Sequence, residues 1–314
     1  MRRIVLQKSP RRQTSMARFV DLEFVTSCPV CDYPISVLNR PILGVRTRRV
    51  LGPAIPPDVM RCANCRTYFR NPRPSGAEIL ASYNRGLMYA QWQQQRRVRE
   101  QIWQIRVRLV TKYRTGGVLL DIGTGDGEFL SVAKAAGFEV IGTEPSTTGT
   151  RLASARGHDV RIGRLQEIDF KDRRFDVVTV WHVLEHVSRP NNLLRRIHEL
   201  LKPDGLLFVA VPNEEWILFR RGFEWRRVPR GMPRLVPGEE IHLTHFQPRT
   251  LKRALKGAGF ALIAFGVDDV DLERTAKERL KQTANCLLST LMGWHLGPAM
   301  YVISRKTEGF PREL

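Results

Sequence analysis

The sequence predicts an α/β fold in which helices cover both faces of a largely parallel sheet, preceded by a small cysteine-bearing module. The first observation is a strand, a glycine loop and a helix in succession across residues 117–137. The second is the wholly apolar run at 206–211, which is typical of a central parallel strand buried on both faces. The third is a pair of Cys-x-x-C motifs near the N-terminus. A chain of 314 residues has room for both parts.

The glycine loop indicates which cofactor the sheet holds. Gly123, Gly125 and Gly127 allow a tight turn and the close approach of a ligand to the backbone. Their spacing differs from the G-x-G-x-x-G of dinucleotide sites, and Asp121 in front of them would repel a pyrophosphate. Glu144, at the tip of the next strand, can accept hydrogen bonds from ribose hydroxyls. This combination favours S-adenosylmethionine, which carries an amino group and a sulfonium, over NAD.

These motifs, together with the run FDVVTVWHVLEHV at 175–187, resemble the class I S-adenosylmethionine-dependent methyltransferases. The similarity covers about residues 116–305. It is to the branch that has a VLEHV segment after the fourth strand, which includes the families called methyltransferase domain 23 and methyltransferase domain 11. It implies a seven-stranded, Rossmann-like mixed sheet with helices on both faces. It also implies the cofactor-binding residues, which are Asp121, Gly123, Thr124, Gly125, Gly127, Glu144, Pro145, Leu165, Gln166, Trp181 and His182.

The other elements follow from apolar runs and end signals. Gly137 and Gly259 are expected to end two helices, and Ser75 to cap one that begins at Ala77. Strands are expected at 138–143, 159–163, 175–180, 206–211, 260–267 and 299–304. Helices are expected at 128–136, 193–201, 251–259 and 271–291, and residues 76–115 are interpreted as a helical linker or cap whose second helix spans about 88–113.

The polar face of that second helix has two interpretations. It is either a solvated surface on a helix that covers the cofactor site or a face that binds anions. The side chains concerned are Arg96, Arg97, Arg99, Arg106 and Arg108.

The net charge of +20 is concentrated in residues 1–115, which hold 22 Lys and Arg against 6 Asp and Glu. Such a bias attracts nucleic acid, anionic lipid or a phosphorylated substrate, and it is equally typical of a solvated arginine-rich surface.

No apolar run reaches the ~18 residues of a membrane span. We expect a cytoplasmic protein with a basic, disordered tail at 1–20; a transit peptide and an over-long start before Met16 are the alternatives. The sequence does not indicate an oligomeric state.

The cysteine pairs predict a structural zinc site. Cys28, Cys31, Cys62 and Cys65 can place four thiolates around Zn²⁺ in a ribbon at 21–75, and such a small module needs its metal to fold. Four thiolates leave no position open for a substrate, which argues against a catalytic metal. The rival interpretation is a redox motif, which normally occurs once and opens a helix. A fifth cysteine, Cys286, is expected in packing.

A substrate lid is expected at 212–247, after the carboxyl end of a strand, where open α/β sheets bind ligands. Arginine forks bind phosphate or carboxylate, and aromatic rings provide flat apolar walls. The predicted acceptor is therefore a small molecule or a lipid- or nucleotide-linked molecule with an anionic group. The side chains concerned are Trp216, Phe219, Arg220, Arg221, Phe223, Trp225, Arg226, Arg227, Arg230 and Arg234.

Methyl transfer requires alignment, and it requires a base where the acceptor holds a proton at neutral pH. His182, His186, His242 and His245 are the candidate bases, because an unperturbed imidazole titrates near pH 7. The preferred catalytic pair is His186 with Glu185 as its orienting partner. The alternative for His186 is a structural role between strand and helix. His242 and His245, which precede Phe246, are expected to brace the lid.

Three further functions are weighed. An RNA-modifying enzyme would grip phosphates with the ribbon and basic helix, but the fourth strand ends in Trp181-His182 rather than in the motif of base amino-group methylases. A non-catalytic adaptor is opposed by the intact glycine loop and Glu144. C-methylation of sugars is ranked below O-methylation, because the context of Cys28 and Cys31 differs from that of the related sugar enzymes.

Overall fold

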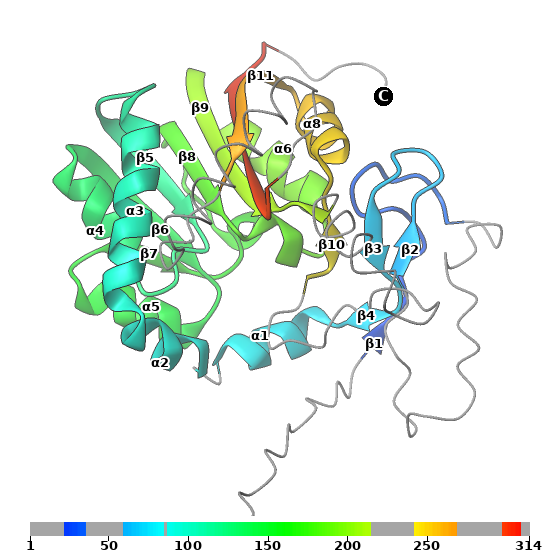
Figure 1. The fold of residues 1–314 in the computed structure, drawn as a ribbon, viewed down its shortest axis with the longest axis horizontal. Helices are drawn as coiled ribbons and strands as arrows, with labels where there is room; N and C mark the ends of the chain where they lie inside the picture. The colour runs from blue at the N-terminus through cyan, green and yellow to red at the C-terminus, as the bar shows by residue number, and fades with distance from the viewer. Residues whose placement is uncertain (1–21, 36–58, 85–86, 215–241, 269–296, 309–314) are drawn as a thin grey trace, which may run out of the picture.

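The central feature of the structure is a seven-stranded sheet (Figure 1). The computed structural model describes residues 22–35, 59–84, 87–214, 242–268 and 297–308. The strands lie in the order β11-β12-β9-β8-β5-β6-β7, and β12 runs opposite to the other six, which confirms the predicted mixed sheet. Their bounds are β5 Gly117–Ile122, β6 Phe138–Glu144, β7 Asp159–Ile162, β8 Phe175–Trp181, β9 Leu201–Pro212, β11 Phe260–Val267 and β12 Ala299–Lys306.

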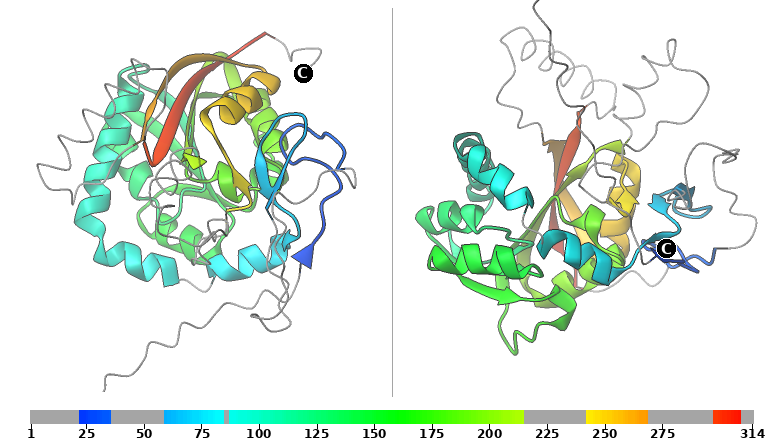
Figure 2. Two further views of the ribbon diagram at one scale, coloured as in Figure 1. Left: turned by 45° about the vertical axis from the view of Figure 1, so that its right-hand side comes forward. Right: turned by 90° about the horizontal axis from the view of Figure 1, so that it is seen from below.

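Helices cover both faces of this sheet (Figure 2). Because successive side chains of a strand point to opposite faces, Leu119 packs with Val107 of α3 and Phe129 of α4. Its neighbour Leu120 belongs to the other core, with Leu194 of α6. The helices are α1 Gly76–Asn84, α2 Leu87–Gln94, α3 Arg96–Thr111, α4 Glu128–Ala135, α5 Thr147–Ala155, α6 Pro190–Leu200 and α8 Pro248–Gly257, with 3-10 turns η1 Leu165–Glu167 and η2 Leu184–His186.

The order of the strands creates a switch point beside β5. The chain passes from β5 to β6 on one side, and β8 later pairs with β5 on the other side. In open α/β sheets, ligands bind outside the carboxyl ends of the strands at such a point. The glycine loop follows β5 and the VLEHV segment follows β8, so both motifs lie at this edge.

The helix predicted at about 88–113 is two helices. Gln95 leaves the helical backbone, with φ −94° and ψ 14°, so α2 ends and α3 begins anew at Arg96. The proposed solvated face also differs from the structure. Arg99 and Arg106 are buried, because each pairs with an acid of a distant segment.

The N-terminal module consists of two small antiparallel sheets. In the first, β1 (Leu22–Glu23) pairs with β4 (Arg73–Pro74). In the second, β3 (Tyr68–Arg70) lies between β2 (Val59–Arg61) and β10 (Thr244–His245). Since β10 follows the sheet's fifth strand by more than 30 residues, this pairing joins the module to the rest of the chain. Phe69 and Met60 belong to the same apolar core as Leu120.

Several predictions concern segments outside the described residues. They are the tail at 1–20, most of the lid at 212–247, the helix at 271–291 and Cys286. None of the helices in the described ranges is long and apolar enough to cross a bilayer.

Candidate cofactor site and histidine cluster

Asp121 lies near the end of β5 and is held by two hydroxyl groups. Thr179 Oγ1 donates to its Oδ1 at 2.6 Å, and Thr124 Oγ1 donates to its Oδ2 at 2.8 Å. Burial raises the pKa of Asp121 to about 7, although these two donors oppose the shift. A cationic ligand group beside this carboxylate would offset the cost of burying its charge.

Glu144 ends β6 and fixes the backbone on two sides of the site. Its Oε2 accepts from the backbone N–H of Gly125 and its Oε1 from that of Ser146, both at 2.9 Å. Burial raises its pKa, while the two backbone donors oppose the shift. A carboxylate has about four lone-pair positions, so it can also accept from a ligand's hydroxyls.

Two of the glycines are required by their close neighbours. Gly123 has φ +71°, and a Cβ there would lie 2.5 Å from Val183 Cγ2. Gly125 has φ +58°, and a Cβ there would meet Trp92 at 2.8 Å. The loop is therefore packed against the segment after β8 on one side and against α2 on the other.

The helix α2 covers the glycine loop with aromatic side chains. Tyr89 is buried and lies against Gly149, and it makes edge-to-face contact with Trp92 at a centroid distance of 5.2 Å. Arg99 of α3 stacks on Trp92 at 4.2 Å and forms a two-pronged ion pair with Asp126 at 2.9 and 3.0 Å. This network connects α2 and α3 to the loop.

The other predicted cofactor residues occupy different environments. Thr124 holds Asp121, and Pro145 lies between Glu144 and the start of α5. Leu165 is buried in the core, whereas the neighbouring Gln166 is exposed. The Trp181 side chain packs under α3 and α4, 5.6 Å from the ring of Phe129, so its indole faces the core.

His182 follows β8 with a left-handed φ of 55°, which is uncommon outside glycine. Its Nε2 lies 2.9 Å from Asp268 Oδ2 and its Nδ1 lies 3.5 Å from Glu185 Oε1. Asp268 also pairs with Arg106 at 2.6 Å. Burial lowers the pKa of His182, but its contacts with the two carboxylates outweigh this effect and raise the pKa to about 9. His182 is therefore protonated at neutral pH, which argues against its role as a base.

The structure brings His186 and His242 together around Glu185. The rings of the two histidines lie 4.8 Å apart at 70°, and His186 Nε2 lies 4.0 Å from Glu185 Oε1. Glu185 is only 1% exposed. Burial tends to raise its pKa, but His182 and His186 hold the pKa below its usual value. The ring of His245 lies 6.4 Å from that of His242, and its Nδ1 lies 3.4 Å from Glu214 Oε2.

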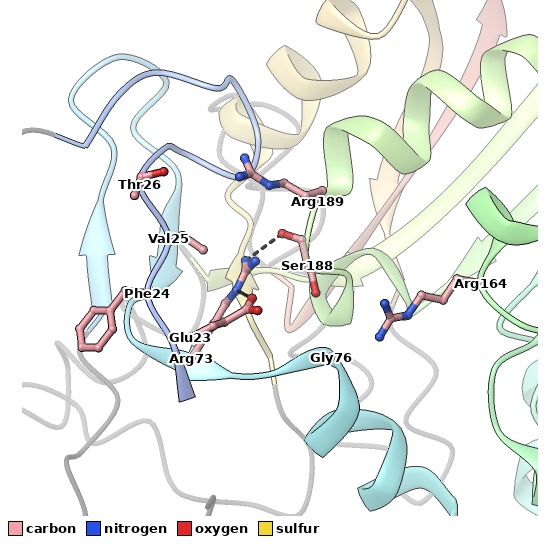
Figure 3. Close-up of a pocket in the computed structure, with 9 residues that line it drawn as sticks. All are labelled: Glu23, Phe24, Val25, Thr26, Arg73, Gly76, Arg164, Ser188 and Arg189. Carbon is pink, nitrogen blue, oxygen red and sulfur yellow. Dashed lines mark hydrogen bonds and ion pairs between the residues drawn. The ribbon is translucent and has the colours of Figure 1, made fainter. Parts of the chain in front are cut away.

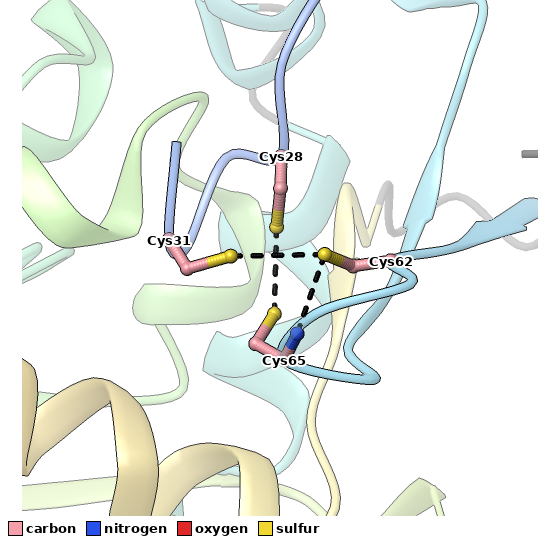
Figure 4. Close-up of side chains that lie close together, drawn as sticks. All are labelled: Cys28, Cys31, Cys62 and Cys65. Carbon is pink, nitrogen blue, oxygen red and sulfur yellow. Dashed lines mark hydrogen bonds between the residues drawn. The ribbon is translucent and has the colours of Figure 1, made fainter. Parts of the chain in front are cut away.

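The four cysteines of the N-terminal module converge (Figure 4). The Cys28 and Cys65 sulfurs lie 3.5 Å apart, and those of Cys31 and Cys62 lie 3.6 Å apart. Sulfurs around a tetrahedral zinc ion, with bonds of about 2.3 Å, lie about 3.8 Å from one another. The donor set and its spacing thus fit Zn²⁺.

A cavity of about 360 Å³ lies between the module and the larger sheet (Figure 3). Arg73, Arg164 and Arg189 are among its lining residues. Arg73 donates to Glu23 at 2.6 Å and to the Ser188 carbonyl at 2.8 Å, so the cavity wall also holds the module in place. None of the lining residues belongs to the glycine loop or to the histidines.

Comparison with known proteins identifies the larger part of the chain. Residues 93–264 match the family model described as a methyltransferase domain. The chain belongs to this family of S-adenosylmethionine-dependent methyltransferases. The match spans more than half of the chain and includes the glycine loop, Glu144 and the histidine cluster.

The methyltransferase is similar to curated proteins named ubiquinone biosynthesis O-methyltransferase. It is 36% identical to one from Rhodopseudomonas palustris over 41% of this chain and 56% of the relative. It is 35% identical to one from Bradyrhizobium over 36% of this chain and 49% of that relative. The chain therefore spans about half the length of these relatives.

The fold of the methyltransferase is shared with a crystal structure from Thermotoga maritima. That protein is described as an S-adenosylmethionine-dependent methyltransferase, possible histamine N-methyltransferase. The TM-score is 0.52 at 20% identity, with 73% of this chain and all of that chain covered. At this identity the similarity supports the fold alone.

Sequence reasoning missed several residues of the candidate site. Thr179 and Tyr89 lie beside Asp121 and Glu144, but a buried threonine in a strand and a tyrosine in a helix carry no distinctive pattern. Asp268 gave a signal that could have been used, because it is an acid directly after the strand ending at Val267. Its partners Arg106 and His182 are far away in sequence.

Proposed function

We propose that this protein is an O-methyltransferase that transfers the methyl group of S-adenosylmethionine to a small acceptor, which is free or linked to a lipid or nucleotide and carries an anionic group. The observation that carries the proposal is a cluster of Glu185 and His186, which follow β8, with His242, which precedes β10. The segment after β8 packs against the glycine loop at Gly123, and this loop connects the strand of the buried Asp121 to the helix before the strand of the buried Glu144. The relatives named O-methyltransferases support the same reaction.

The cofactor is proposed to lie across the tips of β5, β6 and β8. Asp121 would face its ammonium group, and Glu144 would accept from the ribose hydroxyls. Pro145, Leu165 and Gln166 are proposed around the adenine side, and the backbone at Trp181 and His182 near the methionine part. The support for this arrangement is the burial of both carboxylates and the packing of Val183 on Gly123, which places the two segments together.

The acceptor oxygen is proposed to react at the histidine cluster. A hydroxyl group holds its proton at neutral pH, so its attack on the methyl carbon needs that proton removed. His186 is the proposed base of the metal-free site, with Glu185 as its orienting partner, because Glu185 Oε1 lies 4.0 Å from His186 Nε2 and is almost fully buried. His182 is proposed as a fixed positive charge, since Asp268 and Glu185 flank it.

The domain assignment is likewise proposed: a tail at 1–20, a zinc ribbon at 21–75, a helical cap at 76–115 and the catalytic domain at 116–314. A closed four-thiolate site favours a structural zinc ion. Strand β3 of the module pairs with β10 and so holds the segment that bears His242. Nucleic acid is not favoured as the partner, because Arg99 and Arg106 of the basic helix are used in internal ion pairs.

The test is calorimetric titration of the zinc-loaded protein with S-adenosylmethionine, S-adenosylhomocysteine and NAD, followed by a screen of hydroxylated acceptors. We expect micromolar binding of the first two ligands, no binding of NAD, and transfer of the methyl group to oxygen. A folded protein that binds neither adenosyl ligand would overturn the proposal. Transfer to nitrogen or carbon would retain the cofactor site and correct the acceptor atom.

A further inference from the structure

We infer that Glu185, His186 and His242 form a second metal site, which takes a divalent transition-metal ion and through it binds the hydroxyl oxygen of the acceptor. The inference rests on the proposed function and deepens it. It concerns a site separate from the four cysteines. Within the described residues, these two groups are the clusters whose ligand atoms come close enough to share an ion.

The first argument is the state of Glu185. Its side chain is almost fully buried, and neither carboxylate oxygen has a hydrogen-bond donor in the part of the chain that the structure describes. The closest cationic atoms are His182 Nδ1 at 3.5 Å and His186 Nε2 at 4.0 Å, which are longer than hydrogen bonds. A buried carboxylate is costly unless it is paired and hydrogen-bonded or coordinates a metal, and the ion pair with His182 leaves both oxygens of Glu185 without a hydrogen bond. An ion at this position would occupy these oxygens.

The second argument is geometric. One ligand atom from each of the three side chains lies within 4.8 Å of the others. Ligand atoms at about 2.1 Å from one ion are about 3.0–3.5 Å apart. His186 and His242 are partly exposed, so small rotations of their rings can close this gap around an ion. The two rings meet at 70° and are not stacked.

The anchoring of the third ligand supports a built site. His242 comes from a segment remote from the VLEHV run, and the next residue, Leu243, donates its backbone N–H to the Glu185 carbonyl at 2.8 Å. The Leu243 carbonyl accepts from the N–H of Arg70 in β3 at 2.9 Å. The two halves of the cluster are therefore fixed to each other by backbone hydrogen bonds as well as by side-chain contact.

The donor set indicates the class of ion. Two imidazoles and one carboxylate suit Zn²⁺, Fe²⁺, Co²⁺ or Ni²⁺ better than Mg²⁺ or Ca²⁺, which prefer oxygen ligands. Three protein ligands leave positions open, as in catalytic rather than structural sites. The four cysteines, in contrast, saturate a tetrahedral ion.

The reaction balances with the ion as an electrophile. Coordination of the acceptor's hydroxyl lowers its pKa, and the proton passes to water, because His186 is then a ligand and no longer the base. An oxygen lone pair forms the new C–O bond as the C–S bond of the sulfonium breaks. The products are the methyl ether and neutral S-adenosylhomocysteine, and the ion undergoes no change of oxidation state.

The test is a titration with Co²⁺ of protein whose cysteine site is already filled with zinc. Binding is followed by calorimetry and by visible absorption. We expect one additional ion per chain, with the weak absorption of nitrogen and oxygen ligands and without the strong bands of thiolate ligands. His242→Gln and Glu185→Gln should each weaken this binding at least tenfold. His158→Gln is the matched control, because His158 bonds to Ser131 away from the cluster.

The controls separate the possible failures. Thermal unfolding of each variant shows whether the fold is retained, and titration with S-adenosylmethionine shows whether the cofactor site is intact. If S-adenosylmethionine binds but the zinc-loaded protein takes up no Co²⁺, or if both cluster variants retain wild-type Co²⁺ affinity, the metal site is wrong while the proposed function stands. If Co²⁺ binds as expected and S-adenosylmethionine does not, the metal site is supported and the proposed function is wrong.

Discussion

His245 lies opposite Tyr68 in the antiparallel pairing of β10 with β3. One strand belongs to the cysteine module, and the other begins two residues after His242. A structural ion in the module would therefore determine the order of a segment next to the histidine cluster. This relationship provides the first prediction.

Replacement of Cys62 by Ser should loosen β10. Loss of one thiolate weakens a zinc site that supplies most of the folding free energy of a small module. We expect zinc loss and faster amide hydrogen exchange at residues 68–70 and 243–245, with little change in β8. Exchange measured by mass spectrometry tests this, with Cys286→Ser as the control that should keep its zinc. Unchanged protection of 243–245 in a zinc-free protein would contradict it.

Arg99→Met should destabilise the protein by about 3–5 kcal/mol, because it leaves buried acids without their partner. Asp126 and Glu128, at 2.9 and 3.2 Å from the guanidinium, have side chains only 7% and 8% exposed. Urea unfolding measures the loss. The matched control is Arg97→Met on the same helix, where the side chain is exposed and the expected change is within about 0.5 kcal/mol. Equal effects of the two substitutions would refute the role of the ion pair.

Binding of S-adenosylmethionine should release a proton and strengthen as the pH rises through about 7. Burial raises the pKa of Asp121 to about 7, so the free protein holds this proton at lower pH. The ligand's ammonium favours the carboxylate, and the affinity should increase by up to about tenfold per pH unit below the pKa and then level off. Calorimetry in buffers of different ionisation enthalpy detects the proton. Asp121→Asn should abolish this pH dependence, whereas a pH-independent wild type would contradict the assignment.

The same pKa sets the sign of an effect on stability. Between about pH 4 and pH 7 the unfolded protein has lost the Asp121 proton and the folded protein retains it. The contribution of this group to the free energy of unfolding therefore falls as the pH rises through that window. Asp121→Asn should remove the corresponding slope.

Glu144→Gln should reduce the affinity for S-adenosylmethionine by about 10- to 100-fold, because hydrogen bonds to a charged group contribute about 1.5–3 kcal/mol. The amide also turns a donor toward one of the N–H groups of Gly125 and Ser146, which the carboxylate now bridges. Titration calorimetry gives the affinity, and circular dichroism checks the fold. Glu167→Gln is the control, since its carboxylate is exposed and bonds only to the local Arg164 N–H in the described structure.

The strands and the cysteine site could be predicted because their signals are local. The strand at Phe260–Val267 has the predicted bounds, and the spacing of Cys28 to Cys65 is enough to expect convergence. The burial of Arg99 and Arg106 could not be predicted, because their acidic partners are 27 and 162 residues away. A helical pattern marks such arginines as polar and so places them at the surface.

The pairing of β10 was missed for a related reason. Two residues, Thr244 and His245, are too few to show alternation, and they form a strand only because β3 offers them an edge. For the same reason, sequence reasoning listed His186 and His242 as separate candidates. The structure brings their rings to 4.8 Å, around a glutamate whose burial no local pattern reveals.

The β3–β10 pairing also bears on how this chain can be divided. A shortened protein that starts at residue 76 would keep the strands of the seven-stranded sheet but leave the backbone of Thr244 and His245 without its neighbour β3. Exposed strand edges promote self-association. The N-terminal module is therefore joined to the methyltransferase part of the chain by a shared sheet, and replacing the module would require a strand in place of Tyr68–Arg70 that matches the edge of β10.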